Sequence, residues 1–410
     1  MKKIIGYLKS SFYNIRRNKL FSIFYIVGTA LSFVFIIVIL QFVKLISTEV
    51  PPAVNADRTI SIMYFKDKQG RNIGGIMPHQ MEQFAQSANA EKYSYVNNEV
   101  LSCVTEGQFF ETSALFVGGD YFDMNQFDFV SGHAFTKEDI ERKHKVVVIK
   151  ENLAEEYFPN GDAIGKEIYF QGNSYKVVGI VANYSMFVSN AEAGCMMWIP
   201  VSYNKFIPSQ NIFYVINLQF PESMDRGDMG KNLVNAVQAF YANKNQEVDF
   251  DENDVHTQQE EKIESYFSGY IRYGIWGAFA LLLLVPALNI VVLSNSRSSS
   301  REEEMAIKRA IGATKVSIFF QLLSESLVLV IIGLLLGCAL CMPTMDLIQQ
   351  FVMGEEWAKQ MSLITELDWM VIGLQVFPLS LLFTLLSGGL PAYWVAKKNI
   401  AFTLKGGSKV

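Results

Sequence analysis

The sequence is poor in the residues that build metal centres. Its 410 residues include four histidines and four cysteines. None of the histidines lies in a His-Glu-x-x-His pattern. Cys338 and Cys341 stand one helical turn apart inside an apolar run, and we interpret them as packing residues. We therefore expect no metal site.

Motifs for nucleotide binding and acyl transfer are also lacking. The sequence contains no Gly-x-Ser-x-Gly elbow of a serine hydrolase. The stretch GDAIGK at 161–166 has three residues between its glycines where a phosphate-binding loop needs four, and Glu167 follows where the loop needs serine or threonine. We interpret this stretch as a turn before a strand. We expect the chain to be no enzyme and to hold no cofactor itself.

Charged residues are scarce, at 18% of the chain against 50% hydrophobic residues. The apolar residues concentrate in four blocks, 20–46, 270–293, 317–342 and 369–394. Each block is about as long as the roughly 20 residues that cross a bilayer as a helix. The first block is too long for the apolar core of a signal peptide, and no small-x-small cleavage site follows it, so we expect an uncleaved anchor.

Basic residues predict the orientation of these blocks. The segment 1–19 holds six lysines or arginines and no acid, and positive charge recurs in 296–315 and in the tail 395–410. We expect these three pieces, with both termini, in the cytoplasm, and 47–268 and the short loop 344–368 outside. The predicted fold is an integral α-helical membrane protein with four transmembrane helices and a large mixed α/β extracytoplasmic domain between the first and second.

The cytoplasmic pieces are too short to hold a nucleotide-binding, kinase or DNA-binding domain. We therefore expect no nucleic acid partner. If the protein performs ATP-driven work, the motor must be another chain.

The external region is long enough for one or two compact domains. Glu167–Phe170 and Ser174–Val181 read as strands joined by a turn at 171–173. The polar stretch 254–268 runs without a helix breaker toward the second apolar block, so we expect a helical stalk there. Cys103 and Cys195 leave two outcomes open, a disulfide in an oxidising compartment or two buried free thiols.

The segment 296–315 reads SRSSSREEEMAIKRAIGATK and lies between two apolar blocks. Ser300 and Glu303 fit a capping box, and acids in its first turn and bases in its last suit the helix dipole. Gly312 supplies the end of the helix. The pattern predicts a short amphipathic helix at the cytoplasmic membrane surface.

This helix has two interpretations. One is a helix that lies on lipid headgroups. The other is docking on a protein partner. We favour docking, because the three glutamates at 302–304 are unfavourable against an anionic leaflet.

The stretch REEEMAIKRAIGA at 301–313 resembles the coupling helix of MacB/FtsX-type ABC transporter permeases. NIRRNK at 14–19, inside the amphipathic segment 1–19, resembles the family's entry helix, and GGLPAYWVA at 388–396 resembles its closing Pro-Ala motif. In the external region, VGGDYF at 117–122, SGHAF at 131–135 and VVGIV at 177–181 resemble the MacB-type periplasmic core domain. The order of these motifs along nearly the whole chain matches the family. MacB itself carries an ATPase domain fused before the entry helix, whereas this sequence starts with the entry helix. We therefore expect it to resemble the family members whose ATPase is a separate chain.

The resemblance implies a permease subunit in the bacterial cytoplasmic (inner) membrane. Its partners would be an ABC-type ATPase that binds the ATP, a second permease copy or a sister permease, and membrane lipid, with a periplasmic adaptor and an outer-membrane duct left open. The ATPase would drive efflux or export of a peptide, antibiotic or lipoprotein-type substrate through movement of the external domain. The implied docking residues are Arg301, Glu302, Glu303, Glu304, Met305, Ile307, Lys308, Arg309, Gly312 and Ala313.

Three residues inside the third apolar block attract attention. Glu325 is costly there, and we favour a structural or coupling role over a proton relay. Gly333 and Gly337 form a small-x-x-x-small face for close helix packing, with glycines facing lipid as the alternative.

Two rival classes remain. One is a membrane receptor or scaffold that senses an external ligand or, like FtsX, regulates a cell-envelope enzyme. The other is an external hydrolase held by four anchors, for which the sequence offers no nucleophile–base or metal pattern.

Overall fold

The computed structural model describes residues 2–17, 19–158, 163–185, 188, 194–203, 214–267, 273, 276–277, 280, 305, 307–353, 363–389 and 392–393. The chain divides into two compact units. We call one the helical unit, made of Met1–Val43, Gly269–Ile348 and Glu366–Val410. The other is the α/β unit, made of Lys44–Ser268 and Gln349–Thr365.

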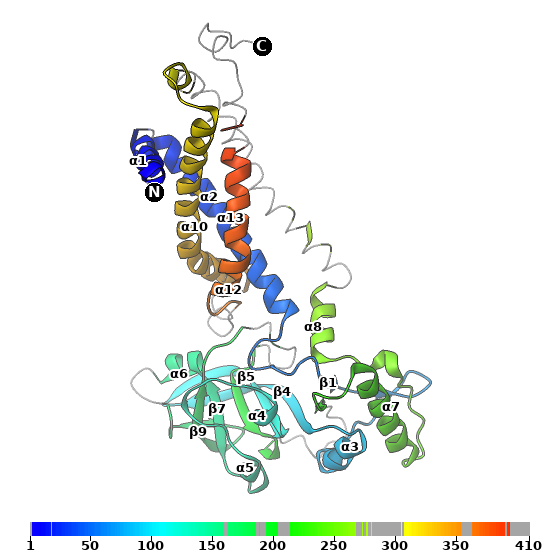
Figure 1. Ribbon diagram of the computed structural model, residues 1–410. Helices are drawn as coiled ribbons and strands as arrows, with labels where there is room; N and C mark the ends of the chain where they lie inside the picture. The colour runs from blue at the N-terminus through cyan, green and yellow to red at the C-terminus, as the bar shows by residue number, and fades with distance from the viewer. Residues whose placement is uncertain are drawn as a thin grey trace. The chain divides into compact units, whose positions relative to one another are not determined.

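The helical unit is built on long apolar helices (Figure 1). Its described elements are α1 (Lys2–Arg17), α2 (Lys19–Ser47), α10 (Lys315–Met353), α12 (Trp369–Val371), a π-helical turn (Ile372–Val376), α13 (Phe377–Thr384) and a second π-helical turn (Leu385–Gly389). Within the described residues, Ser22–Ser47 and Lys315–Phe351 are long and apolar enough to cross a membrane, and Trp369–Thr384 is a shorter apolar helix. The count of four spans stays a prediction, because most of the block 270–293 lies outside the described residues.

The helix α10 is longer than the sequence pattern predicts. It continues through Pro343 to Met353, where we had placed the start of the external loop 344–368. A proline inside a helix leaves one carbonyl without its usual partner, and nearby threonine side chains commonly compensate. The hydroxyl of Thr344 donates a hydrogen bond of 2.7 Å to the carbonyl oxygen of Leu340. This bond goes to the carbonyl next to that of Ala339, which is the carbonyl that the proline leaves without its helical N–H donor. Because the helix continues to Met353, the prediction of a loop is wrong for residues 344–353.

Aromatic and branched side chains hold the helices of this unit together. Tyr25, Phe33 and Ile37 of α2 pack with Leu329, Val330, Leu334 and Cys341 of α10 and with Val371, Val376 and Phe383 of the last helical stretch. The rings of Phe33 and Phe383 lie 5.7 Å apart. Many large apolar side chains on the outside, such as Leu335 and Leu374, are exposed. An apolar exterior around an apolar core is typical of a helix bundle that sits in lipid.

The described part of the α/β unit contains a nine-stranded sheet. Its main path runs β1 (Thr59–Ile62), β11 (Val215–Gln219), β4 (Lys92–Thr105), β5 (Gln108–Gly119), β10 (Met197–Pro200), β7 (Val146–Lys150), β9 (Asn173–Val181) and β6 (Phe129–Gly132). Strand β8 (Glu167–Phe170) pairs with both β4 and β9. This pairing closes the six strands β4, β5, β10, β7, β9 and β8 into a ring.

The ring encloses its own apolar core. Residues alternate between two faces of a strand, so β4 turns Leu101 and Cys103 inward and Val100 and Val104 outward. Each of the six strands contributes to one buried cluster, which includes Phe110, Phe116, Val147, Ile149, Ile168, Phe170, Tyr175, Val177 and Met197. Helix α6 (Glu151–Tyr157) adds Leu153 and Ala154 to the same cluster. The predicted mixed α/β character of the external region is confirmed.

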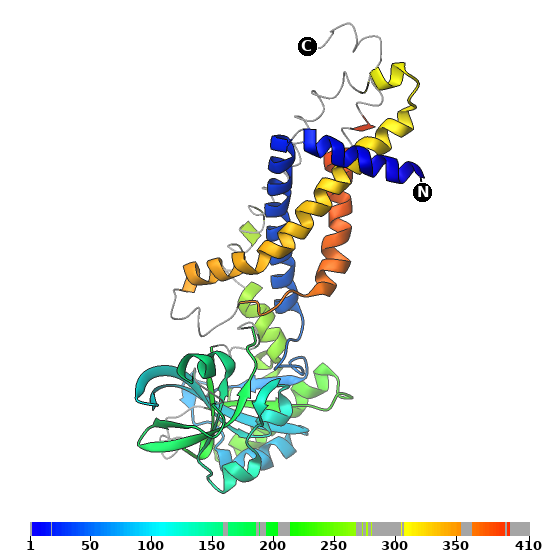
Figure 2. The ribbon, with the colours of Figure 1, turned by 90° about the vertical axis from the view of Figure 1, so that its left-hand side faces the viewer.

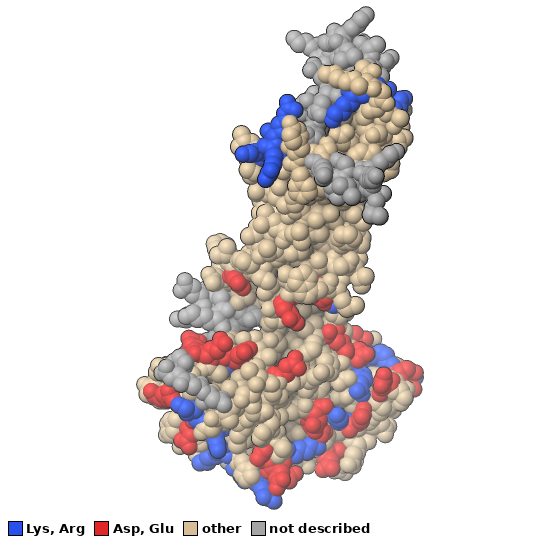
Figure 3. All heavy atoms as spheres, turned by 60° about the vertical axis from the view of Figure 1, so that its left-hand side comes forward, with Lys and Arg blue, Asp and Glu red and all other residues tan. Residues whose placement is uncertain are grey.

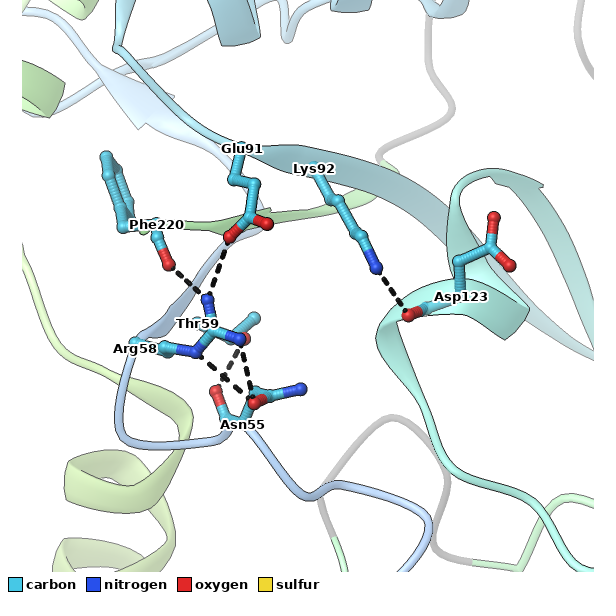
Figure 4. Close-up of polar contacts among 7 residues, drawn as sticks. All are labelled: Asn55, Arg58, Thr59, Glu91, Lys92, Asp123 and Phe220. Carbon is cyan, nitrogen blue, oxygen red and sulfur yellow. Dashed lines mark hydrogen bonds and ion pairs between the residues drawn. The ribbon is translucent and has the colours of Figure 1, made fainter. Parts of the chain in front are cut away.

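A second lobe forms where β1, β11 and the start of β4 meet α3 (Met81–Ser87) and α7 (Arg226–Ala242). Arg58 ties its strands together just before β1 (Figure 4). Its guanidinium donates to the carbonyl oxygen of Phe220 at 2.6 Å, to the carboxylate of Glu91 at 3.0 Å and to the side-chain oxygen of Asn55. The arginine thereby joins three segments that are distant in sequence.

The stalk begins later than the sequence predicts. Helix α8 (Gln258–Phe267) starts after Thr257, whose hydroxyl accepts from the backbone N–H of Glu260 at 3.2 Å. The carboxylate of Glu260 accepts in turn from the backbone N–H of Thr257 at 2.8 Å. This reciprocal capping box fixes the start of the helix inside the predicted stretch 254–268.

The two external cysteines lie in different clusters. Cys103 is buried in the ring core, and Cys195 is buried in a separate cluster around Trp198. Both are free thiols. Burial raises the pKa of the Cys103 thiol to about 12. Of the two outcomes left open by the sequence, the structure has the free thiols.

Candidate docking segment and its support

The structure describes part of the segment expected to dock an ATPase. Arg301, Glu302, Glu303 and Glu304 lie outside the described residues, as does position 306. Met305 and residues 307–310 are helical, and a turn follows before α10 begins. We refer to residues 305–313 as the docking segment.

The docking segment ends in a glycine-dependent turn. Gly312 has a backbone φ of +106°, a conformation that other residues adopt only with strain. The N–H of Ala313 donates to the carbonyl oxygen of Lys308 at 3.0 Å, and the N–H of Gly312 to that of Arg309 at 3.1 Å. These two bonds are the Schellman pattern that closes a helix end. The chain then enters α10 through Thr314, whose hydroxyl accepts from the backbone N–H of Ser317 at 3.2 Å.

One side of the docking segment is anchored and the other is exposed. The side chain of Met305 is 1% exposed and packs with Ile318 and Leu322 of α10. Ile307 is 50% exposed and Ile311 is 82% exposed. Residues four apart lie on the same side of a helix. The segment therefore presents an outward apolar pair while Met305 holds it on α10.

Sequence reasoning placed Ile311 on the apolar side of the segment and inside the docking range 301–313, but it named only Ile307 among the individual docking residues. The spacing of Ile311, four residues after Ile307 and directly before the helix-ending glycine, was the signal that could have added it. The structure also brings Ala392, near the end of the fourth apolar block, into the cluster around Met305.

A polar seam joins α1 to the first turns of α10, and both ribbon views show the two helices side by side there (Figures 1 and 2). The hydroxyls of Tyr7 and Ser317 are 3.2 Å apart. The amide of Gln321 donates to the hydroxyl of Ser10 at 3.2 Å, and the hydroxyls of Ser11 and Ser324 are 3.5 Å apart. The three pairs follow helical spacing on both elements. The entry helix thus supports the part of α10 that carries the docking segment.

The intramembrane residues singled out by sequence all lie on the inward side of α10. The buried stripe of this helix contains Ile318, Leu322, Glu325, Leu329, Gly333, Gly337 and Cys341. Glu325 is 1% exposed and therefore does not face lipid. A methyl group added at Gly333 would lie 2.8 Å from Cγ2 of Thr29, and one added at Gly337 would lie 2.9 Å from Cβ of Phe33. Both glycines allow α2 to approach α10 closely.

Gly388 plays a similar part in the last helical stretch. A methyl group added there would collide with the side chain of Ser326 on α10. Sequence reasoning placed Gly388 in a family motif without a packing role. Its position beside Ser326 depends on how the helices pack, which the sequence pattern does not specify.

The stalk helix binds the end of α2. The side-chain amide of Gln259 donates to the carbonyl oxygen of Ile46 at 3.1 Å, and the ammonium group of Lys262 donates to that of Thr48 at 3.1 Å. The last carbonyls of a helix have no partner within the helix and carry its negative dipole end. Burial lowers the pKa of Lys262 to about 8. These residues join the stalk to α2 in the α/β unit.

Among the described residues, no three His, Cys, Asp or Glu side chains gather as metal ligands. His144 pairs with Asp139 at 2.7 Å as part of a helix start.

Among the described residues, an apolar helical unit with two membrane-length helices and an α/β unit that follows the first of them in the chain indicate a membrane protein with a large inserted domain. Residues 22–228 match the family described as MacB-like periplasmic core domain, and residues 276–400 match FtsX-like permease C-terminal. The chain belongs to the MacB/FtsX-type permease family.

Individual relatives agree with this membership. The chain is 29% identical over 229 residues to "Uncharacterized ABC transporter permease YvrN" of Bacillus subtilis, covering 54% of each chain. It is 24% identical over 231 residues to "Macrolide export ATP-binding/permease protein MacB" of Neisseria meningitidis, covering 56% of this chain and 35% of that one. The chain thus spans about a third to a half of these relatives. The periplasmic region of MacB from Actinobacillus actinomycetemcomitans matches with a TM-score of 0.41 and 15% identity, over 52% of this chain and 95% of that one.

Proposed function

We propose that this chain is the permease subunit of a MacB-like ABC transporter, driven by a separate cytoplasmic ATPase. The ATPase docks on residues 301–313 and draws the docking segment toward that of a second permease, either a copy or a sister chain. The stalk and α2 pass this movement to the external domain. That domain then acts on a peptide, antibiotic or lipoprotein-type substrate, with or without an adaptor and outer-membrane duct.

One observation carries the docking proposal. The segment is fastened to α10 through the buried side chain of Met305 and is closed by the turn at Gly312. It still exposes Ile307 and Ile311. A partner that buries these two side chains gains affinity from apolar burial. Because the segment is anchored to α10, a movement of the bound partner would displace α10 together with the segment.

The proposed placement follows from this role. The chain would lie in the bacterial inner membrane with four spans and both termini in the cytoplasm. Lys308 and Arg309 would face the cytoplasm with the docking segment, as the distribution of basic residues predicts.

Affinity purification of the tagged full chain from its native membrane, with mass spectrometry of bound proteins, tests the proposal. We expect a near-equimolar ABC-type ATPase. Ile307→Asp with Ile311→Asp should release it, because burying two carboxylates without partners is unfavourable. Val100→Asp, at an exposed apolar position of the α/β unit, is the matched control and should retain it.

The opposite result has a clear meaning. If no ATPase copurifies even with trapped nucleotide, the receptor or scaffold alternative replaces the transporter. If the ATPase copurifies and the double variant retains it, the protein remains a transporter subunit but docks through another surface.

A further inference from the structure

Helix α1 has a second face that the docking support does not use. Tyr7, Ser10 and Ser11 turn one side of the helix toward α10. Phe12 and Tyr13 lie away from that side and are 56% and 65% exposed. Two large exposed aromatic rings on a short helix are costly in water. The two rings therefore indicate that this face of α1 contacts a binding partner.

Positive charge accompanies these rings. Arg16 follows Phe12 by four residues and Arg17 follows Tyr13 by four, so each guanidinium lies one turn beyond a ring. Both arginines and Lys19 are exposed. The first 19 residues of the chain contain six basic residues and no acid. The occupant of this face should therefore carry negative charge.

The place of these charges in the fold points to lipid. Lys19 begins α2, and the next exposed residues along that helix are Leu20, Ile23 and Phe24. In Figure 3 the described lysines and arginines of the helical unit gather at one end, and the adjoining surface of that unit is largely uncharged. Charges at the beginning of a membrane-length helix lie at the level of the phospholipid headgroups.

We propose that α1 is a binding surface for anionic phospholipid, with Arg16, Arg17 and Lys19 on the headgroup phosphates and Phe12 and Tyr13 in the acyl boundary. Guanidinium groups bind phosphate oxygens through two parallel hydrogen bonds. Aromatic rings favour the interface between headgroups and chains. Because α1 is hydrogen-bonded to the first turns of α10, next to the docking segment, bound lipid would also restrict the movement of α1 and so stabilise the position of that segment.

Binding of a fluorescent phospholipid to the purified full chain in neutral detergent tests the proposal. The probes are phosphatidylglycerol and phosphatidylcholine with the same labelled acyl chain. We expect tighter binding of phosphatidylglycerol, weakened by added salt. Each basic residue near such a surface contributes about fivefold in affinity, so Arg16→Gln with Arg17→Gln and Lys19→Gln should weaken phosphatidylglycerol binding on the order of 100-fold.

Two further variants sharpen the test. Lys68→Gln with Arg142→Gln and Lys231→Gln changes three exposed basic residues of the α/β unit and should leave binding unchanged. Arg16→Lys with Arg17→Lys keeps the charge and should retain most of the affinity. The assay needs no ATPase, so its result is independent of the proposed transporter role.

Three results would overturn the proposal. Equal affinity for both lipids would make the face an apolar contact without charge selection. Unchanged phosphatidylglycerol binding in the triple glutamine variant would place the lipid elsewhere. Unchanged lipid binding together with loss of the copurifying ATPase would assign the basic residues of α1 to a protein partner instead.

Discussion

The ammonium group of Lys262 on the stalk helix donates a hydrogen bond of 3.1 Å to the carbonyl oxygen of Thr48, just past the end of α2. The lysine is buried, and Gln259 one turn earlier binds the carbonyl oxygen of Ile46. Side chains of the stalk helix thus bond backbone carbonyl groups at the end of the first long helix. In the proposed transporter, this junction would make the two elements move together.

Loosening this junction should be visible in amide hydrogen exchange. Gln259→Ala with Lys262→Met removes both donors and leaves the carbonyl oxygens of Ile46 and Thr48 without them. We expect faster exchange in residues 44–60 and 258–267 of the full chain, with little change in the ring strands. Glu264→Gln, an exposed position on the same helix, is the control. Equal protection in the double variant would show that other contacts hold the junction.

The buried Lys150 should make stability depend on pH. Burial lowers its pKa from 10.5 to about 8, and its ammonium group lies 3.9 Å from the centre of the Tyr184 ring. Between pH 8 and 10.5 the unfolded state holds more protons than the folded state, so stability rises with pH across this window.

Replacing this lysine separates its contribution from that of Lys262, whose pKa is also lowered to about 8. Lys150→Met removes the cost of a buried ammonium group and should stabilise the fold at pH 7 by up to about 3 kcal/mol. It should also remove the part of the rise in stability between pH 8 and 10.5 that Lys150 contributes, while the part due to Lys262 remains. Denaturant unfolding at several pH values measures both. A less stable variant with an unchanged pH profile would contradict the assignment.

Close packing of α2 on α10 should make Gly333 intolerant of a side chain. Gly333→Ala places a methyl group 2.8 Å from Cγ2 of Thr29, and overpacking of this kind costs about 1–3 kcal/mol. Thr29→Gly in the same chain should restore part of the loss. Gly373→Ala adds a methyl group with nothing within 4 Å and should be neutral. Thermal unfolding in detergent compares the four chains, and equal melting temperatures for Gly333→Ala and Gly373→Ala would refute close approach at Gly333.

The two external thiols should be inaccessible in the folded protein. Cys103 and Cys195 are buried in separate clusters and free. A membrane-impermeant maleimide should label neither residue in the native chain and both after denaturation, without added reductant. Labelling after denaturation that requires reductant would reveal a disulfide and contradict the structure.

Local signals predicted several elements well. The turn at Gln171–Gly172 joins β8 and β9 as the hairpin pattern indicates, and Gly312 ends the docking segment as its position before α10 indicates. Both features depend on residues close together in the chain, where backbone preference is strong. The prediction placed the start of the stalk helix too early, because the whole polar stretch 254–268 was taken as one helix. Thr257 and Glu260 have the spacing of a capping box and could have indicated the true start.

The sequence by itself determined the apolar blocks, the charged segment between two of them and the mixed α/β character of the long insertion. These follow from the length and period of hydrophobic runs, which are local properties. Only the tertiary structure decided that β8 closes a ring of strands, that Cys103 and Cys195 face different cores, and that Lys262 binds the end of α2. Each of these depends on contacts between residues far apart in sequence, and those contacts form only when the whole unit packs.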